Sequence, residues 1–174
     1  MMAGRGFGKT RAGAEWVRDI AEPNRSARIA LVAASLGEAR AVMVEGDSGI
    51  LACSPPDRRP AYEPSLRRLR WANGAQATLF SAAEPESLRG PQHSHAWCDE
   101  LAKWSNARRR AISAWDNLQL GLRLGPNQQV LATTTPRAVA PPRVLRSTSK
   151  REQRSGRLSM HLQHCRLFAR NDGN

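Results

Sequence analysis

A glycine-rich segment at the start of the chain has the residue types that bind phosphate. Its sequence, Ala3-Gly4-Arg5-Gly6-Phe7-Gly8-Lys9-Thr10, follows the pattern G-x-x-x-x-G-K-[ST], with alanine in place of the first glycine. Glycines let the backbone wrap so that successive N–H groups point at phosphate oxygens, and a following helix presents its positive end to the same charge. The pattern predicts a nucleotide-binding loop in which Lys9 reaches the β- and γ-phosphates and Thr10 offers its hydroxyl to Mg²⁺. A flexible start with a chance Gly-Lys-Thr is the alternative.

Two adjacent carboxylates, Asp99 and Glu100, follow the short apolar segment 96–98. Hydrolysis of a nucleotide needs a carboxylate for the magnesium ion and a group that orients the attacking water. An Asp-Glu pair after a strand is more often the start of a helix when it is taken alone. Together with the glycine-rich loop, the pair fits both needs.

Three threonines, Thr133, Thr134 and Thr135, close the next predicted strand. Side chains at the carboxyl end of a parallel strand face the bound ligand, although a threonine-rich strand end is equally common as plain structure. The order favours a ligand-facing role. The loop is followed by Asp-Glu about ninety residues later and by the threonines about thirty-five residues beyond, which indicates one ATPase core.

Helices and short buried strands alternate around these groups. Helices are expected over residues 11–20, 35–46 and 107–124, and strands over 28–34, 94–98 and 129–132. Ser35 can cap the second helix, with Glu38 completing a capping box, and this helix is expected to end near Gly46 or Gly49. Such alternation predicts a mostly parallel α/β sheet.

A β-hairpin is predicted around Asn73-Gly74, where residues 66–71 and 76–80 alternate in polarity. A two-residue turn of this type needs positive φ at both central residues, which Asn and Gly tolerate. The segment 53–64 contains four prolines and is predicted to be a loop.

The composition fits one soluble domain. The chain has 174 residues, 40% of them hydrophobic, and a net charge of +12 that makes an anionic partner plausible. Residues 1–136 carry 18 basic and 13 acidic side chains, a net of +5, and residues 137–174 carry 9 and 2, a net of +7. Three separated cysteines indicate neither disulfides nor zinc, and no membrane span or signal peptide is visible. A cytoplasmic protein without membrane contact is expected.

The motifs together resemble the large terminase subunit, the ATP-driven DNA-packaging motor of tailed phages and gene transfer agents. The resemblance covers residues 3–137 and is carried by Gly4–Trp16, Ser87–Gly90, Trp97–Leu101 and Ala132–Pro136. It implies the fold of a P-loop NTPase of the RecA-like (ASCE) kind, a three-layer sandwich with a mostly parallel central sheet and an inserted β-hairpin.

The resemblance also implies roles for single residues. Asp99 would be the Walker B acid that binds Mg²⁺, Glu100 the catalytic carboxylate, and Thr133–Thr135 the motif that couples hydrolysis to DNA movement. Arg5 would contribute to hydrolysis, since a fixed cation near the γ-phosphate stabilises charge in the transition state. The implied cofactors are ATP and Mg²⁺. The implied partners are double-stranded DNA, the portal protein and the small terminase subunit, with a ring oligomer in the cytoplasm of a bacterial host as a possible arrangement.

The chain departs from the family at both ends. Only Met1 and Met2 precede the loop, so the strand that normally anchors it is missing; we expect an unanchored loop and a chain that starts inside a longer gene. Residues 1–136 are predicted to be a partial ATPase domain. Residues 137–174 are predicted to be a disordered or frameshifted basic tail. The two acids of this tail, Glu152 and Asp172, cannot hold two metals, so no nuclease is predicted.

Two other functions remain open at this stage. One is a different P-loop motor, such as a helicase or a restriction translocase. The other is an inactive remnant that binds nucleic acid through its arginines. Arg89 could sense phosphate or lie on the surface, and Arg108–Arg110 fit a solvated helix face better than a DNA contact.

Overall fold

The computed structural model describes residues 1–4 and 6–135. Arg5 and residues 136–174 lie outside the described residues, as do the side chains of residues 105–110. The predicted boundary after residue 136 and the predictions for the tail therefore stay predictions. Within the described part of the chain, no helix has the length and apolar character needed to cross a lipid bilayer.

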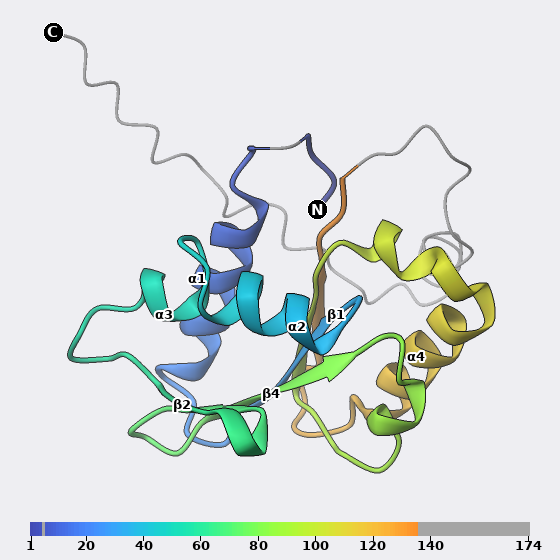
Figure 1. Ribbon diagram of the computed structural model, residues 1–174. Helices are drawn as coiled ribbons and strands as arrows, with labels where there is room; N and C mark the ends of the chain where they lie inside the picture. Colours follow the sequence, from blue (N-terminus) through green and yellow to red (C-terminus); the bar gives the residue numbers. More distant parts are fainter. Residues whose placement is uncertain (5, 136–174) are drawn as a thin grey trace, which may run out of the picture.

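A six-stranded sheet forms the middle of the molecule (Figure 1). Its order is β2-β3-β4-β1-β5-β6, with strands β1 (Arg28–Ala33), β2 (Ala61–Glu63), β3 (Arg68–Arg70), β4 (Gln76–Ser81), β5 (His95–Cys98) and β6 (Gln129–Ala132). β4, β1, β5 and β6 are parallel, whereas β2, β3 and β4 pair antiparallel. The predicted mostly parallel sheet with an added hairpin is confirmed. β2 lies inside the segment 53–64, so the prediction of a loop there was wrong for these three residues.

The helical segments follow the predicted order. They are α1 (Lys9–Ala21), α2 (Leu36–Glu38), its π-helical continuation η1 (Ala39–Val44), α3 (Ile50–Cys53) and α4 (Arg108–Gly121), with 3-10 turns η2 (Pro64–Leu66), η3 (Pro85–Leu88) and η4 (Leu101–Ala107). Ser35 caps α2 as predicted, since its Oγ accepts a hydrogen bond from the N–H of Glu38 at 3.2 Å. The Glu38 carboxylate lies 3.5 Å from Lys103 Nζ.

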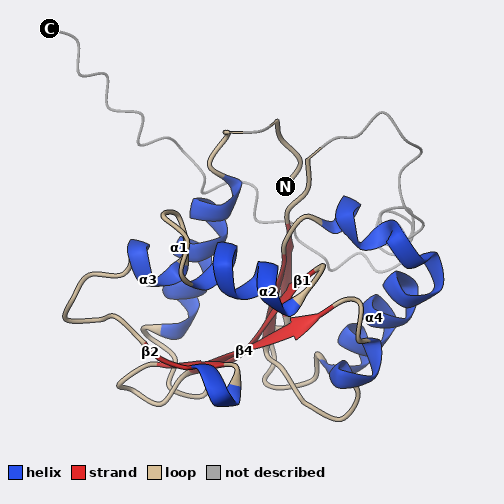
Figure 2. Ribbon diagram, viewed as in Figure 1, coloured by secondary structure: helices blue, strands red, loops and turns tan. Residues whose placement is uncertain are grey.

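Both faces of the sheet are covered, which gives three layers (Figure 2). Successive residues of β1 point to opposite faces. Ile29 and Leu31 pack with Val17 of α1, whereas Val32 packs with Leu118 of α4 on the other face. All five side chains are at most 1% exposed. Burial of each aliphatic side chain contributes about 1.5–3 kcal/mol, which holds α1 and α4 against the sheet.

The hairpin turn differs from the predicted two-residue turn. Only Gly74 has positive φ, at 99°, and its N–H donates to the carbonyl of Trp71 at 3.0 Å. This is the pattern of a three-residue loop with glycine in the left-handed position. Asn73 instead uses its side chain: Nδ2 donates to the carbonyls of Ala21 and Glu22, at 2.8 Å each. The hairpin therefore caps the C-terminal end of α1.

The first residues of the chain lie beside β6. Met2 forms an isolated parallel bridge with Thr134, whose N–H donates to the carbonyl of Met1 at 3.1 Å. The N–H of Ala3 donates to the carbonyl of Thr134 at 3.3 Å. The glycine-rich loop is thus tied to the sheet through residues 1–3, and the expectation of an unanchored loop was wrong.

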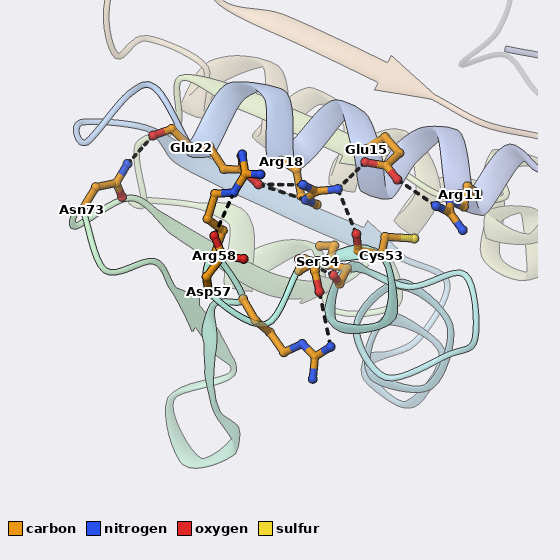
Figure 3. Close-up of polar contacts among 11 residues, drawn as sticks. Arg11, Glu15, Arg18, Glu22, Cys53, Ser54, Asp57, Arg58 and Asn73 are labelled. Atoms are coloured by element: carbon orange, nitrogen blue, oxygen red, sulfur yellow. Dashed lines mark hydrogen bonds and ion pairs between the residues drawn. The ribbon is translucent and has the colours of Figure 1, made fainter. Parts of the chain in front are cut away.

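Arg18 joins α1 to α3 (Figure 3). Its Nη1 donates to Glu15 Oε2 at 2.5 Å and to the carbonyl of Cys53 at 2.8 Å, and its Nε donates to Glu22 Oε1 at 3.0 Å. Glu22 also accepts from Arg58 Nη1 at 3.2 Å. The Arg18 side chain is only 13% exposed, so these partners are partly shielded from water.

We expect Arg18→Met to lower the free energy of unfolding by about 1–3 kcal/mol, because partly buried acceptors lose their donor. Arg11→Met is the matched control. Arg11 is 60% exposed and pairs only with Glu15, so its loss should change stability by about 0.5 kcal/mol or less. Urea unfolding followed by circular dichroism measures both. Equal effects of the two substitutions would contradict the structural role of Arg18.

Candidate nucleotide-binding site

The glycine-rich loop leads directly into α1. Gly6 and Gly8 have φ values of 75° and 74°, a left-handed backbone that glycine adopts without strain. Lys9, the first residue of α1, is 7% exposed, and its Nζ donates to the carbonyls of Ala3 at 2.9 Å and Gly4 at 2.8 Å. An ammonium has three hydrogens, so one is left for an anion at the positive end of the helix.

Lys9 also connects the loop to the predicted carboxylates, because its Nζ lies 3.8 Å from Glu100 Oε1. Asp99 and Glu100 follow β5, and the threonines follow β6. These two strands are neighbours and parallel, so their carboxyl ends meet at one edge of the sheet. Lys9, the Asp-Glu pair and the threonines, which are far apart in the sequence, therefore lie together.

Asp99 is nearly buried, with 7% of its surface exposed. Its Oδ1 accepts a hydrogen bond of 2.6 Å from the hydroxyl of Thr133, which is fully buried. Burial raises the pKa of the Asp99 carboxyl above its ordinary value, and the hydrogen bond from Thr133 opposes that rise.

Glu100 is held by Thr135. The Thr135 hydroxyl donates to Oε1 at 2.6 Å, and its backbone N–H donates to Oε2 at 3.0 Å. Burial alone would raise the pKa of Glu100, but the two hydrogen bonds and the charge of Lys9 outweigh it, so this pKa is lowered. The backbone of Glu100 is left-handed, with φ of 46°.

Trp97 supports this site from below, a role that sequence analysis missed. A Cβ atom at Gly13 would lie 2.2 Å from Trp97 Cε2, so the indole packs directly on the backbone of α1. The indole Nε1 donates to Thr133 Oγ1 at 3.4 Å. The available signal in the sequence is Gly13 itself, a glycine inside a helical segment, which often marks a close approach.

Other predicted site residues are less defined. Arg5 lies outside the described residues. Thr10 is in the first turn of α1 and is partly buried, and Phe7 is 70% exposed. Arg89 is exposed and pairs with Glu86 at 3.0 Å.

A glycine-rich loop before a helix, with carboxylates at the ends of neighbouring parallel strands, defines a P-loop-like α/β fold. The profile of a family described as terminase large subunit, T4-like-virus type, N-terminal, matches residues 1–140. The chain belongs to this family of large terminase subunits. No curated protein sequence matches it.

Solved structures of large terminases have a similar fold. The ATPase domain of the Thermus phage P74-26 large terminase is 17% identical, with a TM-score of 0.60 over 80% of this chain and 59% of that one. The large terminase of a second, thermophilic bacteriophage is 12% identical, with a TM-score of 0.61 over 78% of this chain and 33% of that one. A complex of this second phage protein with ATP-γ-S has a TM-score of 0.54 at 11% identity, over 76% of this chain and 31% of that one. The chain thus spans about a third to three fifths of these structures.

We expect Gly13→Ala to destabilise the fold by about 1–3 kcal/mol, because the new methyl group must displace the indole of Trp97 or α1. The control is Gly37→Ala, where the nearest atom to the new Cβ is Ser35 Oγ at 3.9 Å. That change should be neutral or slightly stabilising, since alanine has the higher helix propensity. Thermal unfolding of both variants tests this, and an unaffected Gly13→Ala variant would refute the close packing.

Proposed function

We propose that this chain is the ATP-hydrolysing part of a motor that moves viral double-stranded DNA into a procapsid. The observation that carries the proposal is the meeting of Lys9 Nζ and Glu100 Oε1 at 3.8 Å, where the glycine-rich loop reaches the end of β5. Membership of the terminase family and the likeness to terminase ATPase domains support it.

In this proposal the loop and α1 bind the phosphates. Backbone N–H groups of residues 4–10 and the positive end of α1 contact phosphate oxygens, and Lys9 donates its remaining hydrogen to the terminal phosphates. Arg5 would add a fixed positive charge near the γ-phosphate. These groups position the nucleotide and stabilise the charge that develops during phosphoryl transfer.

Glu100 would orient the attacking water and accept its proton. Its lowered pKa keeps the carboxylate ionised at neutral pH, as a proton acceptor must be. The hydrogen bonds from Thr135 hold the carboxylate beside the loop instead of letting it turn into solvent. Thr133, Thr134 and Thr135 would couple this step to DNA movement, because they join the carboxylates to β6.

The residues also fit a magnesium ion that arrives with the nucleotide. Within the described residues no group of three His, Cys, Asp or Glu side chains could hold a metal alone, but Mg²⁺ often binds through one carboxylate and substrate phosphates. Thr133 occupies Asp99 Oδ1, and no hydrogen bond from the described part of the chain reaches Oδ2. Asp99 and Thr10 would hold the ion, which neutralises phosphate charge when bound.

The partners would be those of a packaging motor. We propose double-stranded DNA, a portal protein and a small terminase subunit as partners, in a ring oligomer in the cytoplasm of a bacterial host. Contacts to DNA would be largely to phosphates and would weaken strongly with salt.

The two proposed functional side chains should fail in different ways. Lys9→Ala should weaken nucleotide binding and abolish turnover, because it removes the phosphate contact. Glu100→Gln should keep nucleotide binding but lower kcat by about 10²- to 10⁴-fold, because an amide cannot accept the proton. Fluorescent nucleotide titration and a phosphate-release assay separate the two effects.

Glu86→Gln, on an exposed side chain, is the matched control and should hydrolyse ATP normally. If ATP turnover is undetectable in the unsubstituted chain, or survives Lys9→Ala and Glu100→Gln unchanged, the proposed activity is wrong. Stimulation of turnover by procapsids would distinguish a packaging motor from a helicase on the same fold.

A further inference from the structure

The three threonines after β6 make three different contacts. Thr133 donates its hydroxyl to Asp99 Oδ1, and Thr135 donates to Glu100 Oε1, both at 2.6 Å. Thr134 instead accepts a hydrogen bond from the N–H of Ala102 at 3.2 Å. The hydroxyls thus alternate between carboxylates and backbone.

Strand geometry and one unusual backbone angle explain this alternation. Residues two apart in an extended chain lie on the same side, so Thr133 and Thr135 both face the end of β5. Asp99 and Glu100 are adjacent and would point to opposite sides if β5 continued. The left-handed φ of 46° at Glu100 turns the chain, so both carboxylates come within reach of β6.

The hydroxyl of Thr133 has a defined direction. Its oxygen accepts from the indole Nε1 of Trp97, so its single hydrogen is free to be donated. Two acceptors compete for that hydrogen, the Asp99 carboxylate at 2.6 Å and the carbonyl of Cys98 at 3.3 Å. The shorter distance and the charge of the acceptor favour Asp99.

We propose that Thr133 and Thr135 are positioning residues with separate tasks, Thr133 orienting Asp99 and Thr135 orienting Glu100. This inference rests on the function proposed above. It divides the threonine motif, since Thr133 then governs binding of the divalent cation and Thr135 governs the chemical step. Trp97 belongs to the first task, because its indole N–H directs the hydroxyl of Thr133.

The experiment compares valine substitutions, which keep the shape of threonine and remove its hydroxyl. Binding of Mn²⁺ in the presence of ADP, followed by electron paramagnetic resonance, reports on Asp99 without turnover. Steady-state hydrolysis at saturating Mg²⁺ and ATP reports on Glu100. Thr78→Val on β4 is the matched control, since no hydrogen bond in the described residues joins Thr78 to either carboxylate.

Thr133→Val should weaken Mn²⁺ binding by about 10- to 100-fold, as the loss of a hydrogen bond to a metal ligand typically does. Thr133→Ser should restore binding, because serine keeps the hydroxyl. At saturating Mg²⁺, Thr133→Val should recover most of its kcat. Thr135→Val should show the reverse: Mn²⁺ binding like the unsubstituted chain and a kcat lowered about tenfold, with part retained because the backbone N–H of Thr135 still reaches Glu100.

The outcomes separate this inference from the function on which it rests. If the unsubstituted chain binds no Mn²⁺ with ADP and hydrolyses no ATP, both fail. If it does both, but Thr133→Val and Thr135→Val lose metal binding and kcat in the same proportion, or neither differs from Thr78→Val, the division of tasks is wrong and the proposed function stands. A Thr133→Ser variant as weak as Thr133→Val would also overturn the role of the hydroxyl.

Discussion

The packing of Trp97 on Gly13 determines where the parts of the site lie relative to each other. Trp97 is fully buried, and its ring occupies the space that any side chain at residue 13 would need. Helix α1 therefore sits close to β5, with Lys9 one turn before the contact and Asp99 two residues after the indole. The same indole donates to Thr133, so the loop, the Asp-Glu pair and the threonine segment are all fixed around one aromatic ring.

Adjacent carboxylates in this site have opposite properties. Asp99 is buried and its pKa is raised, whereas Glu100 receives two hydrogen bonds from Thr135 and its pKa is lowered. Environments that move the pKa values of two carboxyl groups apart are typical of sites where the two groups do different work. Here the difference arises from the change of backbone direction between the two residues, which leaves Asp99 in the core and brings Glu100 toward the loop.

The fold followed from the sequence where local pattern and tertiary structure agree. Apolar runs such as 28–34 and the Ser35 cap are local signals, and the loop motif is specific enough to place Lys9 and Thr10. β2 could not be predicted, because its three residues are held by pairing with β3 and not by a pattern of their own. The role of Asn73 as a cap for α1 was likewise hidden, since its partners are about fifty residues away. The pairing of each threonine with its own carboxylate depends on a backbone angle that no composition rule specifies.

The left-handed backbone at Glu100 has a consequence for how this gene can change. That conformation costs a residue with a Cβ about 1–2 kcal/mol, whereas glycine adopts it freely and asparagine more easily than glutamate. Selection for a stable fold alone would therefore favour replacement of this residue. A glutamate persists there only while activity is selected, so in copies of the gene released from that selection this position should drift early, and the protein should become more stable as it does.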